Sequence, residues 1–156
     1  MRIFRTLAVV IFSALVALTG AGCSVRNVRP VDAHAYPITV VCIQENPKVV
    51  VPEFVTVIEE GFARHGIRSR RVHTPAPADC EYTVSYTARQ SWDFVPYLRS
   101  AELRLAHGDE TIGTATYYHR RGLAPSKWAG ARSKMAPVMD ELLSGFPPRD
   151  GSGSLR

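Results

Sequence analysis

Cysteine is scarce in this chain of 156 residues, which has three, at positions 23, 42 and 80. Three cysteines are too few for a disulfide-built scaffold. No close spacing relates the five histidines, and neither a CxxC nor an HExxH pattern occurs, so we expect no metal site. The chain also lacks a G-x-S-x-G pattern and a glycine-rich phosphate loop. We therefore assign no catalytic residue and expect no cofactor.

No stretch of the chain is apolar for long enough to cross a bilayer. The longest run, from Leu7 to Leu18, has twelve residues. As a helix it would cover roughly 18 Å, short of the roughly 30 Å of a hydrocarbon core. Arg2 and Arg5 precede the run, and small residues follow it. This pattern predicts a secretory signal peptide over residues 1–22 rather than a membrane-spanning helix.

The predicted signal ends in Ala21 and Gly22, followed by Cys23. This ending resembles the lipobox of bacterial lipoproteins, with Gly20 where that motif usually has leucine. The resemblance implies that Cys23 is the first mature residue and carries acyl chains, in which each buried CH2 group contributes about 0.8 kcal/mol to membrane binding. Ser24, and not aspartate, follows the cysteine. The same resemblance then implies the periplasmic face of the outer membrane, with the inner membrane as the alternative.

Neither sign of charge dominates the mature chain. The full sequence has 19 Lys and Arg against 14 Asp and Glu, a net charge of +5. Without Arg2 and Arg5, 17 basic residues remain against 14 acidic ones, a net charge of +3. With 46% hydrophobic and 21% charged residues, the composition is that of one ordinary globular domain.

Apolar periodicity predicts seven elements. Residues 23–37 have no periodic pattern and are expected to form a flexible tether. Beyond it, the spacing of apolar residues predicts strands over 38–43, 67–73, 82–89, 101–105 and 111–119, and helices over 52–65 and 126–143. Ser126 is the expected cap of the second helix, whose apolar stripe includes Trp128. The tail over 147–156, rich in Pro, Gly and Ser, is expected to be disordered.

These elements form one domain over residues 38–146, in the order strand, helix, four strands, helix. Two amphipathic helices cannot bury their apolar stripes on each other and also cover both faces of a sheet. The sequence therefore predicts an α+β two-layer sandwich, in which a mostly antiparallel sheet of about five strands carries both helices on one face.

Cys42 and Cys80 remain once Cys23 is acylated. In an oxidising compartment such a pair most often forms a disulfide, and two separate buried thiols are the alternative. A bridge would require the end of strand 38–43 and the start of strand 82–89 to lie side by side, and the simplest arrangement makes the two strands adjacent and antiparallel. The polar loop after the first strand, from Glu45 to Lys48, would then lie near the bridge and far from Trp92.

Two stretches of the chain are basic. Arg68, Arg70 and Arg71 form the first, and Arg120 and Arg121 form the second. An exported protein is not expected to bind nucleic acid, so anionic lipid headgroups or lipopolysaccharide phosphates are the accessible partners. A charged edge strand that discourages aggregation between sheets is the simpler explanation of the first stretch.

The segment from Ser91 to Tyr97 combines four bulky side chains with one acid. We single out Trp92, Asp93 and Tyr97 as candidate partner-binding residues. The alternative interpretation places these bulky side chains inside the end of the core.

Several short stretches resemble the Sbal family of small proteobacterial lipoproteins. They are Cys42–Ile43 with Glu45–Lys48, Glu59–Phe62 with Arg64–Ile67, Cys80–Thr83, and Ser91–Asp93 with Tyr97–Leu98. This resemblance covers about residues 40–143, implies an acylated Cys23 and a paired Cys42 and Cys80, and assigns no catalytic residue. In its order of elements the chain is also similar to small α/β lipoproteins that assist envelope transport and assembly.

These expectations describe an outer-membrane lipoprotein that is not an enzyme. We expect an accessory or scaffold protein, attached to the membrane by its lipid anchor, that binds an envelope protein partner. The first alternative is a domain that binds or senses an envelope lipid or glycan, and a hydrolase with a dispersed site is a second alternative.

Overall fold

The computed structural model of this protein describes residues 24–120 and 125–149. The predicted signal peptide over 1–22, Cys23, Arg121 and residues 150–156 lie outside the described residues. The elements, in chain order, are β1 (Ser24–Arg29), β2 (Val40–Gln44), α2 (Phe54–Arg64), β3 (Arg68–Val72), β4 (Tyr82–Asp93), β5 (Val95–His107), β6 (Glu110–His119), the 3-10 helix η2 (Pro125–Trp128) and α3 (Ala131–Leu142).

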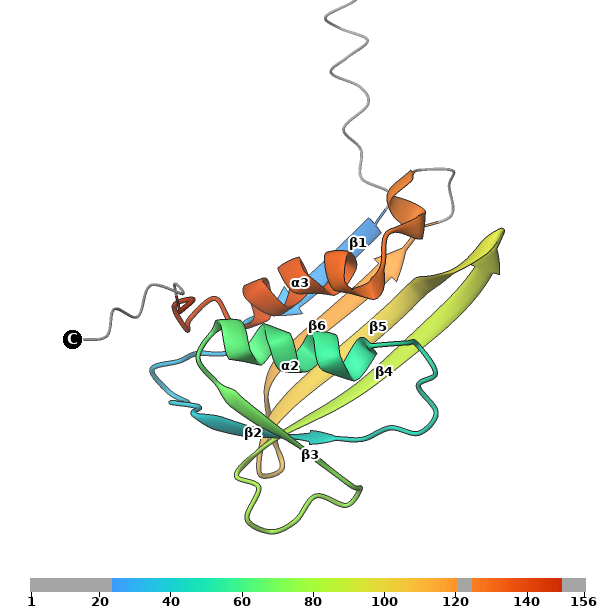
Figure 1. The fold of residues 1–156 in the computed structure, drawn as a ribbon. Coiled ribbons are helices and arrows are strands. Elements are labelled where there is room, and N and C mark those ends of the chain that lie inside the picture. Colours follow the sequence, from blue (N-terminus) through green and yellow to red (C-terminus); the bar gives the residue numbers. More distant parts are fainter. Residues whose placement is uncertain (1–23, 121–124, 150–156) are drawn as a thin grey trace, which may run out of the picture.

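The strands form one sheet in the order β1-β6-β5-β4-β2-β3. Strands β1, β6, β5 and β4 pair antiparallel, whereas β2 runs parallel to both of its neighbours. Helices α2 and α3 contact each other and lie on the same face of the sheet (Figure 1). This confirms the predicted α+β fold with both helices on one face, although the sheet has six strands and not five.

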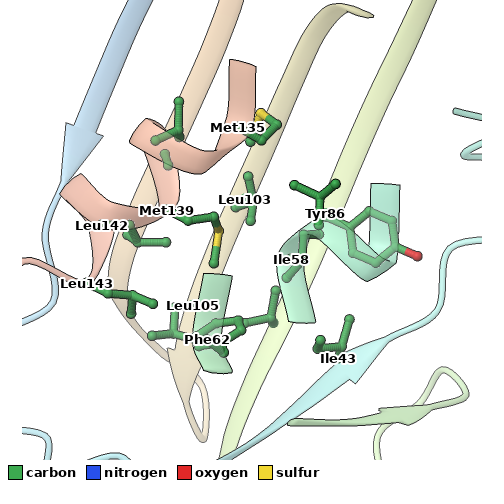
Figure 2. Packing of buried hydrophobic residues seen from close by; sticks show 14 of the residues in the cluster. Ile43, Ile58, Phe62, Tyr86, Leu103, Leu105, Met135, Met139, Leu142 and Leu143 are labelled. Atoms are coloured by element: carbon green, nitrogen blue, oxygen red, sulfur yellow. The ribbon is translucent and has the colours of Figure 1, made fainter. Parts of the chain in front are cut away.

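The core fills the space between the helices and the sheet. Alternate residues of β4, beginning with Tyr82 and Val84, are buried, as the period-2 pattern predicts. Figure 2 shows Phe62 of α2 beside Leu105 of β5, and Met139 of α3 near Leu103 of the same strand. No helix in the described part of the chain has the length and apolar character needed to span a bilayer.

Strand β1 corrects the predicted tether over 23–37. Ser24 to Arg29 pair with β6 along their whole length, and Val31 behind them is buried in the core. The strand lies at the edge of the sheet, and five of its six residues are exposed. An edge strand is held by backbone hydrogen bonds, which need no alternation of apolar side chains. The folded domain therefore begins at residue 24 and not at residue 38.

The direction of β2 is a second correction. We predicted that the strand containing Cys42 and the strand following Cys80 are antiparallel neighbours. They are neighbours, but β2 runs parallel to β4, with Cys42 opposite Thr83. Helix α2 connects β2 to β3, which pair in parallel, and such a strand–helix–strand unit places its two strands in the same direction.

The last predicted helix begins later than expected. Residues 125–128 form η2, and α3 starts at Ala131 after Gly130, so Ser126 does not cap it. Pro137 lies within α3, as predicted, but Trp128 is exposed and does not belong to the buried stripe. Within the predicted tail, the backbone N–H of Arg149 still donates to the carbonyl of Arg64, at 2.8 Å.

Candidate functional site

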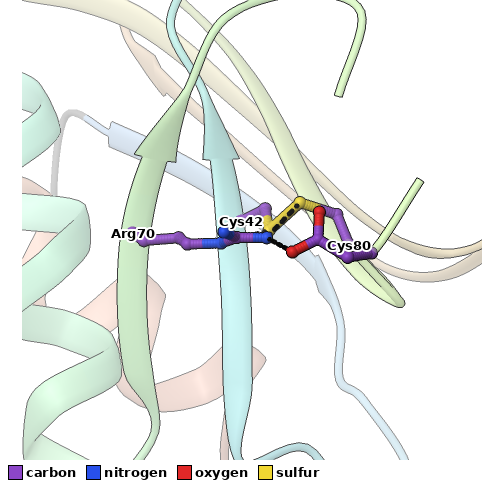
Figure 3. Close-up of a disulfide and its surroundings, with 4 residues drawn as sticks. Cys42, Arg70 and Cys80 are labelled. Atoms are coloured by element: carbon purple, nitrogen blue, oxygen red, sulfur yellow. Dashed lines mark hydrogen bonds and ion pairs between the residues drawn. A yellow bond between two sulfur atoms is a disulfide. The ribbon is translucent and has the colours of Figure 1, made fainter. Parts of the chain in front are cut away.

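The predicted pairing of Cys42 with Cys80 is confirmed. The two residues form a disulfide, with their Cα atoms 5.9 Å apart, on the β3 side of the sheet (Figure 3). Arg70 lies beside the bridge, where its guanidinium contacts Cys42 Sγ at 3.3 Å and pairs with Asp79 at 2.5 Å. The bridge joins β2, one strand in from the edge strand β3, to the segment just before β4.

The first basic stretch is largely neutralised. Besides the pair between Arg70 and Asp79, Arg71 donates to both carboxylate oxygens of Glu59, at 2.8 and 2.7 Å. The hydrogen bonds with Arg71 lower the pKa of Glu59 despite its partial burial. The stretch forms β3, the edge strand of the sheet, so the structure favours the charged-edge interpretation.

The polar loop after β2 lies against the middle of β4. Asn46 Nδ2 donates to the carbonyl of Tyr86 at 2.9 Å, and the Asn46 backbone N–H donates to the Tyr86 hydroxyl at 3.2 Å. A shallow pocket of about 880 Å³ opens beside this loop. No cluster of three metal-ligating side chains occurs in residues 24–120 and 125–149.

The candidate segment around Trp92 forms the tip of a long hairpin. Strand β4 runs on to Asp93, β5 begins at Val95, and Phe94 alone makes the turn, with a φ of 61°. Trp92 and Phe94 are 72% and 82% exposed. The alternative that placed both side chains in the core is therefore wrong. A phenylalanine at positive φ is strained and uncommon. Because the ring is exposed, packing in the core does not compensate for this strain.

Helix η2 is fastened to this tip. The Lys127 ammonium forms an ion pair with Asp93, and the Trp128 indole N–H donates to the Asp93 carbonyl at 3.2 Å. Lys127 is buried although it is charged, and a buried charge must be paired. The pair with Asp93 provides that partner.

Tyr97 lies beneath the tip and does not share its surface. The residue is 9% exposed. The Lys127 and Lys134 ammonium groups lie 4.8 and 5.5 Å from the ring centroid, and His119 packs edge-on against it. Of the three predicted partner-binding residues, the structure therefore places Trp92 and Asp93 at the tip and Tyr97 in the layer that supports it.

Strand β1 begins at the same end of the sheet. Ser24 pairs with His119 at the end of β6, and this end also carries the β4–β5 tip (Figure 1). We call it the Ser24 end. Eight large apolar side chains are exposed in the described part of the chain, and six gather there: Val25, Trp92, Phe94, Val95, Tyr118 and Trp128. Sequence reasoning missed this cluster because its members come from four separate segments.

The Ser24 end is also basic. Arg26 lies opposite Tyr117, and Arg89 lies opposite Ser100. Arg99 lies within β5, and Arg120 directly follows the end of β6. Arg99 contacts the ring of Tyr118, with 5.9 Å between its Cζ atom and the centroid. Aromatic rings interleaved with arginines are typical of surfaces that meet the boundary between lipid and water.

No family model and no curated protein matches the chain. Among solved structures, it is similar to the PelC dodecamer from Paraburkholderia phytofirmans, with 14% identity over 74% of this chain and 97% of that one and a TM-score of 0.44. A leucine-to-methionine variant of that dodecamer matches with 13% identity over 82% and 100% of the two chains and a TM-score of 0.49. At these scores, no property of those assemblies is carried over to this chain.

Proposed function

We propose that this protein is a non-enzymatic accessory lipoprotein of the outer membrane, held on its periplasmic face by acyl chains on Cys23. We further propose that the Ser24 end rests on the bilayer. The observation that carries this proposal is the gathering of six of the eight exposed large apolar side chains at the end where residue 24 begins the fold. Exposed apolar patches of this kind mark membrane or protein contacts.

The attachment leaves little freedom to the domain. Ser24 follows Cys23 directly and is already paired to His119 in the sheet. An acylated Cys23 would therefore hold the edge of the sheet at the headgroups without a flexible spacer. Ser100 pairs with Tyr118 and Ser24 with His119, so Arg99 is level with Ser24 across the sheet. The turn residue Phe94, just before β5, lies five residues beyond Arg99 toward the tip, which is about 17 Å of strand. With the strands inclined to the bilayer normal, the tip and Ser24 reach the same surface.

The tip supplies orientation more than affinity. Acyl chains hold a protein to a bilayer firmly once two or three are present. Burial of an aromatic side chain such as Trp92 or Phe94 adds about 1.5–3 kcal/mol each, and the surrounding arginines attract anionic headgroups. The rest of the surface then faces the periplasm, available to the envelope protein partner of an accessory protein.

The first experiment tests the anchor. Cells that express the full chain are labelled with radioactive palmitate, and the membranes are separated by density. We expect label on the wild type in the outer-membrane fraction and none on Cys23→Ser. An unlabelled wild-type protein would contradict the proposal.

The second experiment tests the orientation with the mature protein in vesicles that contain phosphatidylglycerol. The chain has two tryptophans, so Trp128→Phe leaves Trp92 as the single fluorophore. We expect bromine-labelled lipid to quench Trp92. The matched control moves the fluorophore to the loop after β2, where Val50 is 76% exposed: Trp92→Phe with Trp128→Phe and Val50→Trp should not be quenched. Equal quenching at both positions would contradict the orientation.

A protein partner at the tip is the second candidate, because exposed tryptophan near arginine is also typical of binding hot spots. A photo-crosslinking amino acid in place of Phe94 distinguishes the two in intact cells. Crosslinks to lipid support bilayer contact, whereas a repeated crosslink to one protein supports the partner and contradicts the bilayer contact.

A further inference from the structure

A small pocket opens on the helix side of the Ser24 end. It has a volume of about 250 Å³ and lies between β1, the end of β6 and the first turns of α3. Its lining residues with charged or polar groups are Ser24, Arg26, Tyr117, His119, Ser133 and Lys134. Among the described residues, no carboxylate lines it. The pocket therefore presents hydrogen-bond donors and positive charge, with no acid to balance them.

Lys134 is the first group that lacks a counterion. The residue is 7% exposed, and its ammonium donates to the carbonyls of Leu98 and Lys127, at 3.3 and 2.6 Å. In the described part of the chain it forms no ion pair, and Asp93 pairs with the neighbouring Lys127. Burial, and then the like charge of Lys127, lower the pKa of Lys134. A buried ammonium without an anion is costly.

His119 is the second pocket residue with an unsatisfied polar group, here a ring nitrogen without a hydrogen-bond partner among the described residues. The residue is 4% exposed, and its Nε2 is the one buried side-chain N or O atom without a hydrogen-bond partner in the part of the chain that the structure describes. Buried polar atoms are nearly always paired, so an orphan of this kind needs an explanation. A ligand oxygen in the pocket would provide the missing partner.

The start of α3 adds further donors. This helix of 12 residues begins at Ala131 after Gly130, which provides no side-chain cap, and its first turn has no acidic residue. The N–H groups of an uncapped first turn are unsatisfied and carry a partial positive charge. Because Ser133 and Lys134 line the pocket, this first turn borders it.

We propose that this pocket binds a phosphate group, with Lys134, Arg26 and His119 as its charged and polar ligands. The position of Ser24 at the rim identifies the source as the headgroup phosphate of an anionic phospholipid in the same bilayer that holds Cys23. This assignment of the source rests on the proposed function. A bound headgroup would fix the sheet edge at the depth of the phosphates.

The test uses the mature protein and two variants, Lys134→Met and Arg26→Met. Lysine to methionine keeps the length of the buried side chain, so the fold should persist. Arg26 is exposed on the edge strand and is the second variant in case the first does not fold. The matched control is Lys48→Met, an exposed lysine in the loop after β2.

We measure binding of phosphatidylglycerol to the protein in detergent micelles by native mass spectrometry, and binding of inorganic phosphate and glycerol 3-phosphate by the chemical shifts of the His119 ring nitrogens. We expect wild type and Lys48→Met to retain the phospholipid. In each pocket variant, the fraction of protein with bound phospholipid should fall at least 10-fold. Phosphatidylcholine, whose headgroup has no net charge, should bind less.

The arms of the experiment separate the sources. Retained phospholipid with weak shifts from soluble phosphates supports a headgroup, whereas strong shifts from phosphate without retained phospholipid overturn it in favour of a free anion. No shift and no difference between wild type and the pocket variants overturns the pocket altogether. The quenching of Trp92 by brominated lipid is independent of this result, so it shows whether the bilayer contact fails as well.

Discussion

At the scale of single residues, the Cys42–Cys80 bridge allows a symmetric prediction. The two cysteines are 38 residues apart in the sequence, and closing a loop of this length stabilises a fold by roughly 3–4 kcal/mol. We expect Cys42→Ser and Cys80→Ser each to lower the free energy of unfolding by a similar amount, and the double variant to be no worse, because each change removes the same bond. Urea unfolding checks this. Reductant should destabilise the wild type alone, and additive losses in the double variant would contradict the bridge.

Asp140 allows a prediction about pH. Partial burial raises the pKa of its carboxyl, but hydrogen bonds from Arg64 and His65 outweigh this effect, so the pKa lies below its ordinary value. A lowered folded pKa stabilises the protein above the unfolded value of about 3.9, and this contribution is lost as the pH falls through the folded value.

We therefore expect Asp140→Asn to cost about 1 kcal/mol of unfolding free energy at pH 7. Half of the Asp140 side chain is exposed, so solvent screening limits the effect. The difference from wild type should shrink below pH 4, as the native carboxyl takes up its proton. Unfolding curves at pH 7 and pH 3 measure it, and a difference that grows in acid would contradict the ion pair.

At the scale of elements, the contact between α2 and α3 depends on Gly61. A Cβ atom at this position would lie 2.7 Å from Met139 Cγ and 2.8 Å from its Cβ. Glycine to alanine within a helix normally gains about 1 kcal/mol, whereas overpacking costs about 1–3 kcal/mol. We expect Gly61→Ala to lower the unfolding free energy by about 1 kcal/mol, because the clash outweighs the gain in helix propensity.

A double-mutant cycle checks the cause of this loss. Met139→Ala alone should cost about 2–5 kcal/mol. In that background Gly61→Ala should become neutral or stabilising, because the clashing side chain is gone. An unchanged cost of Gly61→Ala would exclude the helix contact as its origin.

A substitution at the hairpin tip should weaken membrane contact without lowering the stability of the fold. Phe94 has a φ of 61°, a conformation that asparagine adopts more readily. We expect Phe94→Asn to leave the unfolding free energy unchanged or to raise it by up to about 1 kcal/mol, while quenching of Trp92 by brominated lipid falls. Val50→Asn, the same kind of change outside the Ser24 end, should leave quenching unaffected. A large loss of stability in Phe94→Asn would instead place its ring in the core.

At the scale of the whole molecule, the proposed orientation depends on the absence of a spacer between the anchor and the sheet. Ten Gly and Ser residues inserted between Cys23 and Ser24 would add a flexible coil with an end-to-end distance of about 17 Å. We expect palmitate labelling to persist and the quenching of Trp92 to fall several-fold, because the local concentration of the tip at the bilayer drops. Unchanged quenching would show that the tip binds without help from the anchor geometry.

Local patterns were sufficient for much of the fold. The structure confirms the alternation from Tyr82 to Arg89 and the turn at Gly108. The 3.6-residue period predicted both helices, although α3 begins only at Ala131 and Trp128 is exposed. The sequence also predicted the disulfide, because a pair of cysteines in a chain that is expected to be exported leaves few alternatives.

The sequence by itself therefore determined the α+β class, both helices, most of the strands and the bridge. Each of these depends on residue types or spacings that can be recognised within the sequence. Only the tertiary structure decided that Ser24 to Arg29 form a strand, that β2 runs parallel to β4, and that Val25, Trp92 and Trp128 share one end. Strand pairing depends on backbone hydrogen bonds, which are the same for every side chain, and a surface cluster depends on segments far apart in the chain.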